Sequence, residues 1–170
     1  MKKIVITGPE SSGKSTLCKH LSESLFIPHV REYAREYIGS LNRAYNQGDL
    51  IHIAKGQVGL EEDILCQTPS YLICDTDLLT IKIWSDYKYG NCDSSIVDLL
   101  NKNLPDLYLL TSPDVPWKED PQRENPDNRE ELFSIYKEEI IKLDVPYVVL
   151  SGTEPERLEH AMEIFSNYFN

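Results

Sequence analysis

Residues 8–15 constrain the fold of this chain more than any other part of its sequence. They read GPESSGKS and match the phosphate-binding pattern G-x-x-x-x-G-K-[ST] at every fixed position. A largely apolar segment, residues 3–7, precedes them, and Leu17, Leu21 and Leu25 follow at every fourth position. This order predicts a buried strand, a glycine-rich turn and an amphipathic helix, whose first backbone N–H groups can bind phosphate oxygens.

The residue types at the fixed positions fit that chemistry. Gly8 and Gly13 allow positive φ angles and let amides approach an anion, because no Cβ stands in the way. Lys14 is expected to reach the β- and γ-phosphates, and the Ser15 hydroxyl to bind Mg²⁺. The predicted nucleotide-binding residues are Gly8, Glu10, Ser11, Ser12, Gly13, Lys14, Ser15 and Thr16.

The rest of the chain predicts an α/β fold. Further segments rich in Val, Ile, Leu and Tyr are predicted strands at residues 27–31, 71–75, 107–111 and 147–150. They are nearly continuous apolar runs separated by helical patterns, which is typical of a parallel sheet with helices on both faces. A length of 170 residues predicts a single domain over residues 1–170.

Composition narrows the expected partners and location. Seventeen basic and 28 acidic residues give a formal net charge of −11, which disfavours binding to nucleic acid or to an anionic membrane surface. No apolar run approaches the roughly 18 residues of a membrane span. The four cysteines form no C-x-x-C pair, so we expect reduced thiols and a cytoplasmic location. With nucleic acid and membrane disfavoured, small molecules are the expected partners.

Acidic residues follow two of the predicted strands, where ligands bind in parallel sheets. Asp75 is expected to hold Mg²⁺ together with Ser15. Glu32 is placed to accept the proton of an attacking hydroxyl, although a surface ion pair with a neighbouring arginine is the alternative. Asp77 is either a substrate contact or an ordinary helix N-cap.

Residues 112–128 are predicted to form a lid, because they contain four prolines and one tryptophan between two regular elements. Arg123 and Arg129 flank this segment, and guanidinium groups on a lid can stabilise charge on a transferring phosphoryl group. The alternative is a solvated charged loop.

Several side chains have two interpretations. Tyr33, Trp84 and Trp117 can form walls for a flat ring or pack in the interior. Gln57 and Glu61 lie on the apolar stripe of the helix predicted over residues 49–66, so they need polar partners from either the protein or a ligand.

Four segments together resemble the ribosylnicotinamide kinase domain of NadR-type NAD biosynthesis proteins. They are residues 8–16 (GPESSGKST), 31–37 (REYAREY), 73–77 (ICDTD) and 114–130 (DVPWKEDPQRENPDNRE). The resemblance implies a three-layer P-loop NTPase fold with a five-stranded parallel sheet in the order 2-3-1-4-5. It also implies a kinase that uses ATP and Mg²⁺ to phosphorylate the 5′-hydroxyl of nicotinamide riboside, which gives nicotinamide mononucleotide for NAD salvage.

Carried over to this sequence, the resemblance implies a role for each matching residue. Residues 8–16 bind ATP, Glu32 or Asp77 contacts the ribose, and Trp117 stacks on the nicotinamide. The implied catalytic set is Lys14, Glu32, Asp75, Arg123 and Arg129. The implied substrate-binding set is Glu32, Tyr33, Asp77, Trp84 and Trp117, and the implied metal-binding set is Ser15 and Asp75.

Two other functions stay open at this stage. The acceptor could be another nucleoside or a nucleoside monophosphate, although a monophosphate needs extra cations, and Arg31, Arg35 and Arg43 are the only concentrated set outside the lid. A nucleotide-binding regulatory ATPase or GTPase is the other alternative. GTPases recognise guanine with an N-K-x-D motif. The similar segment here, residues 101–104, has Leu104 in place of the aspartate.

Overall fold

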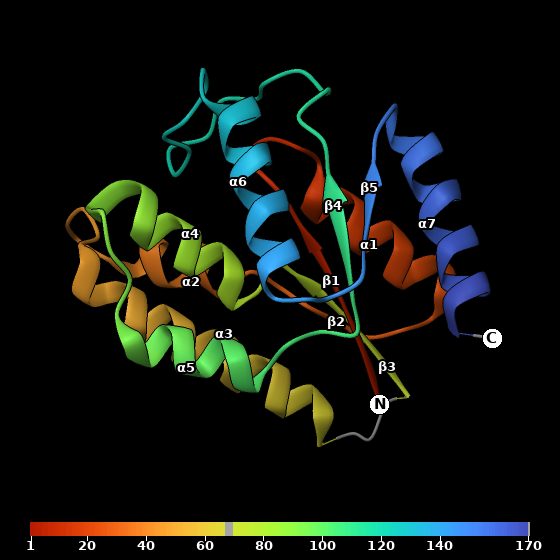
Figure 1. Cartoon of the computed structure of the whole chain (residues 1–170), viewed down its shortest axis with the longest axis horizontal. Coiled ribbons are helices and arrows are strands. Elements are labelled where there is room, and N and C mark those ends of the chain that lie inside the picture. Colours follow the sequence, from red (N-terminus) through yellow and green to blue (C-terminus); the bar gives the residue numbers. More distant parts are fainter. Residues whose placement is uncertain (67–69, 170) are drawn as a thin grey trace.

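The computed structural model describes residues 1–66 and 70–169 (Figure 1). In chain order the elements are β1 (Lys2–Thr7), α1 (Lys14–Leu25), β2 (His29–Val30), α2 (Tyr33–Ser40), α3 (Gln47–Leu65), β3 (Tyr71–Asp75), α4 (Leu78–Tyr89), α5 (Ser94–Lys102), β4 (Leu107–Thr111), α6 (Arg129–Lys142), β5 (Tyr147–Leu150) and α7 (Glu154–Phe169).

The strands form one parallel sheet in the order β2-β3-β1-β4-β5, which confirms the predicted order. β1 is the central strand and pairs with β3 on one side and β4 on the other. Its residues Ile4, Val5 and Ile6 are at most 1% exposed, because helices cover the sheet on both faces.

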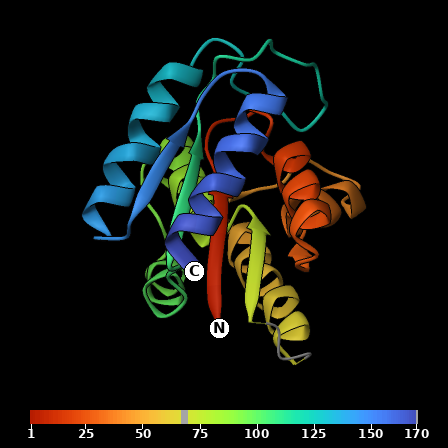
Figure 2. The same ribbon diagram turned by 90° about the vertical axis from the view of Figure 1, so that its right-hand side faces the viewer.

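Alternate side chains of the sheet build two separate cores, as the pleat of a strand requires. Ile4 and Ile6 point to one face and pack with α1 and α7. Val5 points to the other face, where the core is completed by α2 to α6. Figure 2 shows α7 crossing in front of the central strand on the first of these faces. The molecule therefore has three layers.

The second strand is shorter than the predicted 27–31. Only His29 and Val30 pair with β3. Pro28 has no N–H to donate, and the chain turns into α2 soon after Val30, so β2 is a short edge strand. This early turn places Glu32 beside the carboxyl end of β3.

The segment between β4 and α6 runs across the carboxyl ends of the strands, at the top of the molecule in Figure 1. It carries no helix or strand and corresponds to the predicted lid. Within residues 1–66 and 70–169, no helix has the length and apolar character needed to cross a membrane.

Candidate active site

The loop between β1 and α1 has the backbone that the glycine-rich motif predicts. Gly8 has a φ of 139° and Gly13 a φ of 83°. A Cβ on Gly8 would lie 2.6 Å from the backbone oxygen of Thr111, so only glycine fits there. Gly13 is the N-cap of α1, and no side chain caps this helix. The first N–H groups of α1 are therefore left for an anion.

A cavity of about 320 Å³ lies beside this loop. All the residues predicted to bind the nucleotide line it, together with Glu32, Trp84 and Arg123 from the other predicted sets. The cavity thus connects the phosphate-binding loop with the start of α2, with α4 and with the lid. Five predicted site residues do not line it, namely Tyr33, Asp75, Asp77, Trp117 and Arg129.

Lys14 lies within the curve of the loop. Its Nζ donates hydrogen bonds to the backbone oxygens of Gly8 at 2.9 Å and Pro9 at 2.7 Å. Burial lowers the pKa of this ammonium, while the nearby carboxylates of Glu32 and Asp75 act in the opposite direction. The loop carbonyls hold the ammonium at the cavity wall, where phosphate oxygens can replace them as acceptors.

Asp75 and Ser15 provide the oxygen donors that a magnesium ion requires. Asp75 ends β3, is 7% exposed, and its Oδ1 has no hydrogen-bond partner. Burial raises the pKa of this carboxyl, whereas a hydrogen bond from Ser15 lowers it. A buried carboxylate oxygen without a partner, next to a hydroxyl, fits a hard cation that takes its remaining ligands from phosphates and water.

Glu32 is the N-cap residue of α2, yet its side chain makes no capping hydrogen bond. Its Oε2 instead accepts a hydrogen bond from Arg35 Nε at 3.1 Å, so the expected pairing with an arginine is present, at the wall of the cavity. Burial and the charge of Asp75 raise the pKa of the Glu32 carboxyl. Such a group is better suited to accept a proton near neutral pH than an exposed glutamate.

The structure favours the N-cap alternative for Asp77 over a contact with the substrate. The side chain is buried, and its Oδ1 accepts a hydrogen bond from Leu79 N at 3.1 Å as the N-cap of α4. Its Oδ2 accepts a hydrogen bond from the Tyr108 hydroxyl at 2.7 Å. These contacts satisfy both oxygens inside the protein and leave Asp77 outside the cavity.

The aromatic residues divide in the same way. Trp84 lines the cavity, as predicted. Tyr33 does not, because its ring packs on the backbone of α3 so closely that a Cβ on Gly56 would lie 2.1 Å from it. The ring of Tyr37 lies beside it, with 6.1 Å between the ring centroids. Tyr33 is therefore a packing residue of α2 and α3.

The lid is held against the phosphate-binding loop. The Glu10 carboxylate accepts hydrogen bonds from the backbone N–H groups of Glu124 at 3.0 Å and Asn125 at 2.9 Å. The Ser11 hydroxyl accepts one from the N–H of Lys118 at 2.8 Å. Two side chains of the glycine-rich loop thus fasten the lid in a closed position over the cavity.

The lid arginines hold backbone atoms in this state. Arg129 donates to the backbone oxygens of Ser11 at 3.3 Å and Val115 at 2.9 Å, and Arg123 donates to that of Lys118. Both guanidinium groups lie within 6 Å of the centre of the Trp117 ring. Trp117 is covered by these two cations and lies outside the cavity lining, which contradicts its predicted contact with a substrate ring.

Gln57 and Glu61 have protein partners. Gln57 Oε1 accepts a hydrogen bond from Tyr33 N at 2.9 Å, and Glu61 Oε2 pairs with Lys3 Nζ at 2.7 Å. Neither residue lines the cavity. One polar atom of each side chain is thus satisfied by α2 or β1, whereas Gln57 Nε2 and Glu61 Oε1 are buried and have no hydrogen-bond partner among the described residues.

Sequence reasoning missed Arg157, which lines the cavity from α7 and is 3% exposed. Its guanidinium donates to the backbone oxygens of Ser12, Ser112 and Gly152 and pairs with Asp114. It thereby ties the phosphate-binding loop to the start of the lid.

A signal for Arg157 was present in the sequence. It precedes the small apolar residue Ala161 by four positions in the last helix, which places both residues on one face of that helix, and Ala161 is 1% exposed. Arg35 and Gln122 also line the cavity and were not among the predicted site residues. Both contribute to the contact between α2 and the lid.

The sequence and the fold match known proteins. The trifunctional NAD biosynthesis/regulator protein NadR of Salmonella typhimurium is 27% identical over 124 residues, which cover 71% of this chain and 30% of NadR. The chain therefore spans about a third of the length of this relative.

Solved structures with the same fold cover nearly all of the chain. NadR in complex with NR has a TM-score of 0.78 at 20% identity, covering 98% of this chain and 51% of that one. NadR with NAD and AMP-PNP has a TM-score of 0.82 at 21% identity, covering 98% and 49%. Thymidylate kinase from Ehrlichia chaffeensis has a TM-score of 0.72 at 16% identity, covering 96% and 98%.

The fold, the glycine-rich loop and these similarities agree, and the resemblance to NadR is confirmed in both sequence and fold. The sequence pattern of the AAA domain family matches residues 3–157, which is most of the chain. The chain belongs to the AAA domain family and has the α/β fold of P-loop kinases.

Proposed function

We propose that this protein is an ATP-dependent kinase that transfers the γ-phosphate to the 5′-hydroxyl of nicotinamide riboside. The observation that carries the proposal is one cavity with two different ends. The donor end is the phosphate-binding loop with Lys14 and Ser15, and the acceptor end, next to it, is the largely buried carboxylate of Glu32, on which the charges of Lys14 and Asp75 act. Such a pair of ends suits transfer of a phosphoryl group from a nucleotide to an alcohol.

The donor end binds and orients the triphosphate. The loop amides and Lys14 contact the phosphate oxygens, and Ser15 and Asp75 hold Mg²⁺, which neutralises phosphate charge when bound. The lid covers this end through Glu10 and Ser11. A closed lid excludes the water that would otherwise hydrolyse ATP.

The acceptor end receives the proton. In the reaction the acceptor hydroxyl oxygen forms a bond to the γ-phosphorus while the bond from that phosphorus to the bridging oxygen of ADP breaks. Glu32 takes the hydroxyl proton, and its raised pKa makes it a stronger base than an ordinary glutamate. Products are a phosphate monoester, ADP and a protonated Glu32.

Charge and shape favour a nucleoside acceptor over a monophosphate. Arg35, the cation beside Glu32, already forms ion pairs with Glu32 and with Asp120, the latter at 3.0 Å. Its guanidinium is therefore not free to bind the phosphate of a monophosphate acceptor. Nicotinamide riboside is a pyridinium cation, which an aromatic side chain such as Trp84 can contact favourably. NadR, whose sequence and fold are similar, has been solved in complex with NR.

The test is a panel of acceptors with Mg-ATP, followed by ADP release and by mass spectrometry of the product. We expect nicotinamide riboside to be converted to its mononucleotide with the highest kcat/KM of the panel. Faster turnover of thymidine, uridine or a nucleoside monophosphate would show that the acceptor is wrong. Release of ADP and inorganic phosphate with no phosphorylated acceptor would instead indicate a regulatory ATPase.

A further inference from the structure

A chain of three charged side chains connects the proton acceptor with the lid. Arg35 Nε donates to Glu32 Oε2 at 3.1 Å, and Arg35 Nη1 donates to Asp120 Oδ2 at 3.0 Å. Glu32 precedes α2, Arg35 lies in the first turn of α2, and Asp120 belongs to the lid. One guanidinium group therefore contacts the acceptor end of the cavity and the lid at the same time.

A second contact fixes the same junction. Gln122 Nε2 donates to the backbone oxygen of Arg35 at 3.3 Å, and Gln122 N donates to Asp120 Oδ1 at 2.9 Å. Asp120 and Gln122 thus contact both the side chain and the backbone of Arg35. Both contacts require the lid to lie on α2.

The planar geometry of the guanidinium group explains why the contact of Arg35 with Asp120 affects its contact with Glu32. The group is planar and its donors point in fixed directions, so binding one carboxylate orients the donors offered to a second. The Arg35 side chain is 42% exposed and that of Glu32 is 12% exposed. Arg35 can therefore turn into solvent when Asp120 leaves, whereas Glu32 has little room to follow it.

We propose that Arg35 is a positioning residue that couples closure of the lid to the placement of the Glu32 carboxylate. When the lid is shut, Asp120 holds the guanidinium in the orientation that fixes Glu32 toward the acceptor hydroxyl. When the lid opens, Glu32 loses this partner and the proton acceptor is no longer in place. The inference rests on the proposed role of Glu32 and adds to it a dependence on Asp120.

The charges around Glu32 make the proposal testable by the sign of a pKa change. The groups that face it are Lys14 on α1, Asp75 on β3 and Arg35 on α2. Removing the negative charge of Asp120 acts on Glu32 by simple electrostatics and would lower its pKa. Release of Arg35 from Glu32 has the opposite effect, because the guanidinium stabilises the ionised carboxylate.

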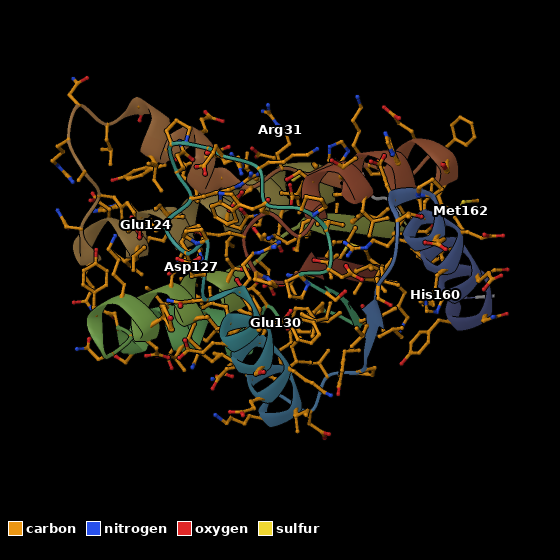
Figure 3. All side chains as sticks on the ribbon, turned by 90° about the horizontal axis from the view of Figure 1, so that it is seen from above. Arg31, Glu124, Asp127, Glu130, His160 and Met162 are labelled. Carbon is orange, nitrogen blue, oxygen red and sulfur yellow. The ribbon has the colours of Figure 1, made fainter. Side chains whose placement is uncertain are left out.

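The experiment compares Asp120→Asn, Arg35→Met and the double variant with the unaltered protein. The Glu32 carboxyl is titrated by ¹³C NMR in the full chain without substrate. We expect the pKa of Glu32 to rise in Asp120→Asn and to rise further in Arg35→Met. The pKa of Glu32 in the double variant should not exceed that in Arg35→Met, because without the guanidinium the loss of Asp120 has only its direct, pKa-lowering electrostatic effect. Arg31→Met is the matched control, since Arg31 is exposed at the outer surface (Figure 3) and does not line the cavity.

Kinetics provide the second readout. In Asp120→Asn we expect kcat for acceptor phosphorylation to fall about tenfold, with the KM for ATP changed by less than about twofold, because only the placement of the base is disturbed. The acid limb of the pH profile should move to higher pH in step with the Glu32 titration. Arg35→Lys should recover only part of the kcat lost in Arg35→Met, since an ammonium group lacks the planar set of donors with which a guanidinium binds two carboxylates.

Three results would overturn the proposal: a lowered pKa of Glu32 in Asp120→Asn, additive effects in the double variant, or equal effects from Arg31→Met. Failure of the proposed function looks different. If no acceptor is phosphorylated by the unaltered protein, the catalytic role of Glu32 falls, while the NMR titration still reports whether the lid controls this carboxylate.

Discussion

The two ends of the cavity are built in different ways. The donor end comes from one short stretch, residues 8–16, in which both glycines have the positive φ angles that the turn requires. The acceptor end is assembled from the start of α2, from α4, from the lid and from α6. The residues proposed to bind the nucleotide are therefore neighbours in the sequence, whereas those proposed to bind the acceptor are brought together by the packing of distant segments.

Asp75, at the end of β3, and Asp77, two residues later, also differ in what their side chains contact. Asp75 has a buried oxygen without a partner and lies next to Ser15. Asp77 has both oxygens occupied by Leu79 and Tyr108. An aspartate after a strand is therefore not a functional residue by position alone. The available partners decide which one is left for a ligand.

The largest effect is expected at the donor end. Lys14→Ala should reduce phosphoryl transfer about 10³-fold, because it removes a preorganised cation that faces developing phosphate charge. The rate is measured by ADP release under saturating ATP and acceptor. Lys19→Ala is the control on the exposed side of the same helix, and an equal loss in both variants would contradict the assignment.

A smaller but sharper effect is expected at the acceptor end. Glu32→Gln should lower kcat about 10²-fold with the KM for ATP unchanged, because a general base is removed and the donor site is left intact. In the unaltered protein kcat should rise with pH through a value above the ordinary pKa of glutamate, since burial and Asp75 raise the pKa of Glu32. This limb should be missing in Glu32→Gln.

A control for Glu32 is available one turn further along α2. Glu36 is exposed and does not line the cavity, so Glu36→Gln should keep both the rate and the pH profile. If the acid limb persists in Glu32→Gln, the proton acceptor is another group, and Asp75 becomes the first candidate.

The contrast between the two aspartates predicts a loss of stability without a loss of binding. Asp77→Ala should lower the free energy of unfolding by about 1–3 kcal/mol, because Leu79 N and the Tyr108 hydroxyl lose a buried acceptor. Denaturant unfolding measures the change. The acceptor KM should stay within about twofold, in line with a residue outside the site. A large rise in the acceptor KM at unchanged stability would restore a substrate role.

The smallest effect is expected where Glu10 binds the lid. Glu10→Ala removes the acceptor of two lid amides, which should speed amide hydrogen exchange of Glu124 and Asn125 about tenfold, equivalent to about 1.4 kcal/mol of lost protection. Amides in the buried strand β4 should exchange as before. Unchanged exchange at Glu124 and Asn125 would mean that Glu10 does not hold the lid.

Much of the fold followed from local rules. The parallel α/β sheet, the positive φ angles at Gly8 and Gly13 and the convergence of the nucleotide-binding residues on one cavity were predicted, because strand pattern and turn chemistry are properties of adjacent residues. The strand order, in contrast, was implied by the resemblance to NadR-type proteins. The packing at Gly56 is different, because the Tyr33 ring from another helix fills the space of its missing Cβ.

The acceptor side could not be predicted to the same extent. Whether Tyr33 and Trp117 face a ligand or the protein depends on partners far along the chain, such as Gly56 on α3 and Arg129 at the start of α6. The same holds for Arg157, whose partners Ser12, Ser112 and Asp114 come from two distant segments. These contacts follow from the packed structure and leave only a weak trace in residue spacing.

The most direct test of the central claim follows the phosphoryl group itself. The protein is incubated with Mg²⁺, nicotinamide riboside and ATP labelled with ³²P at the γ-position, and the products are separated by chromatography. The label should appear in nicotinamide mononucleotide at a rate equal to that of ADP formation, and this transfer should be lost in Lys14→Ala. Label found only in inorganic phosphate, or retained in ATP, would contradict the claim that one cavity joins a nucleotide to an alcohol.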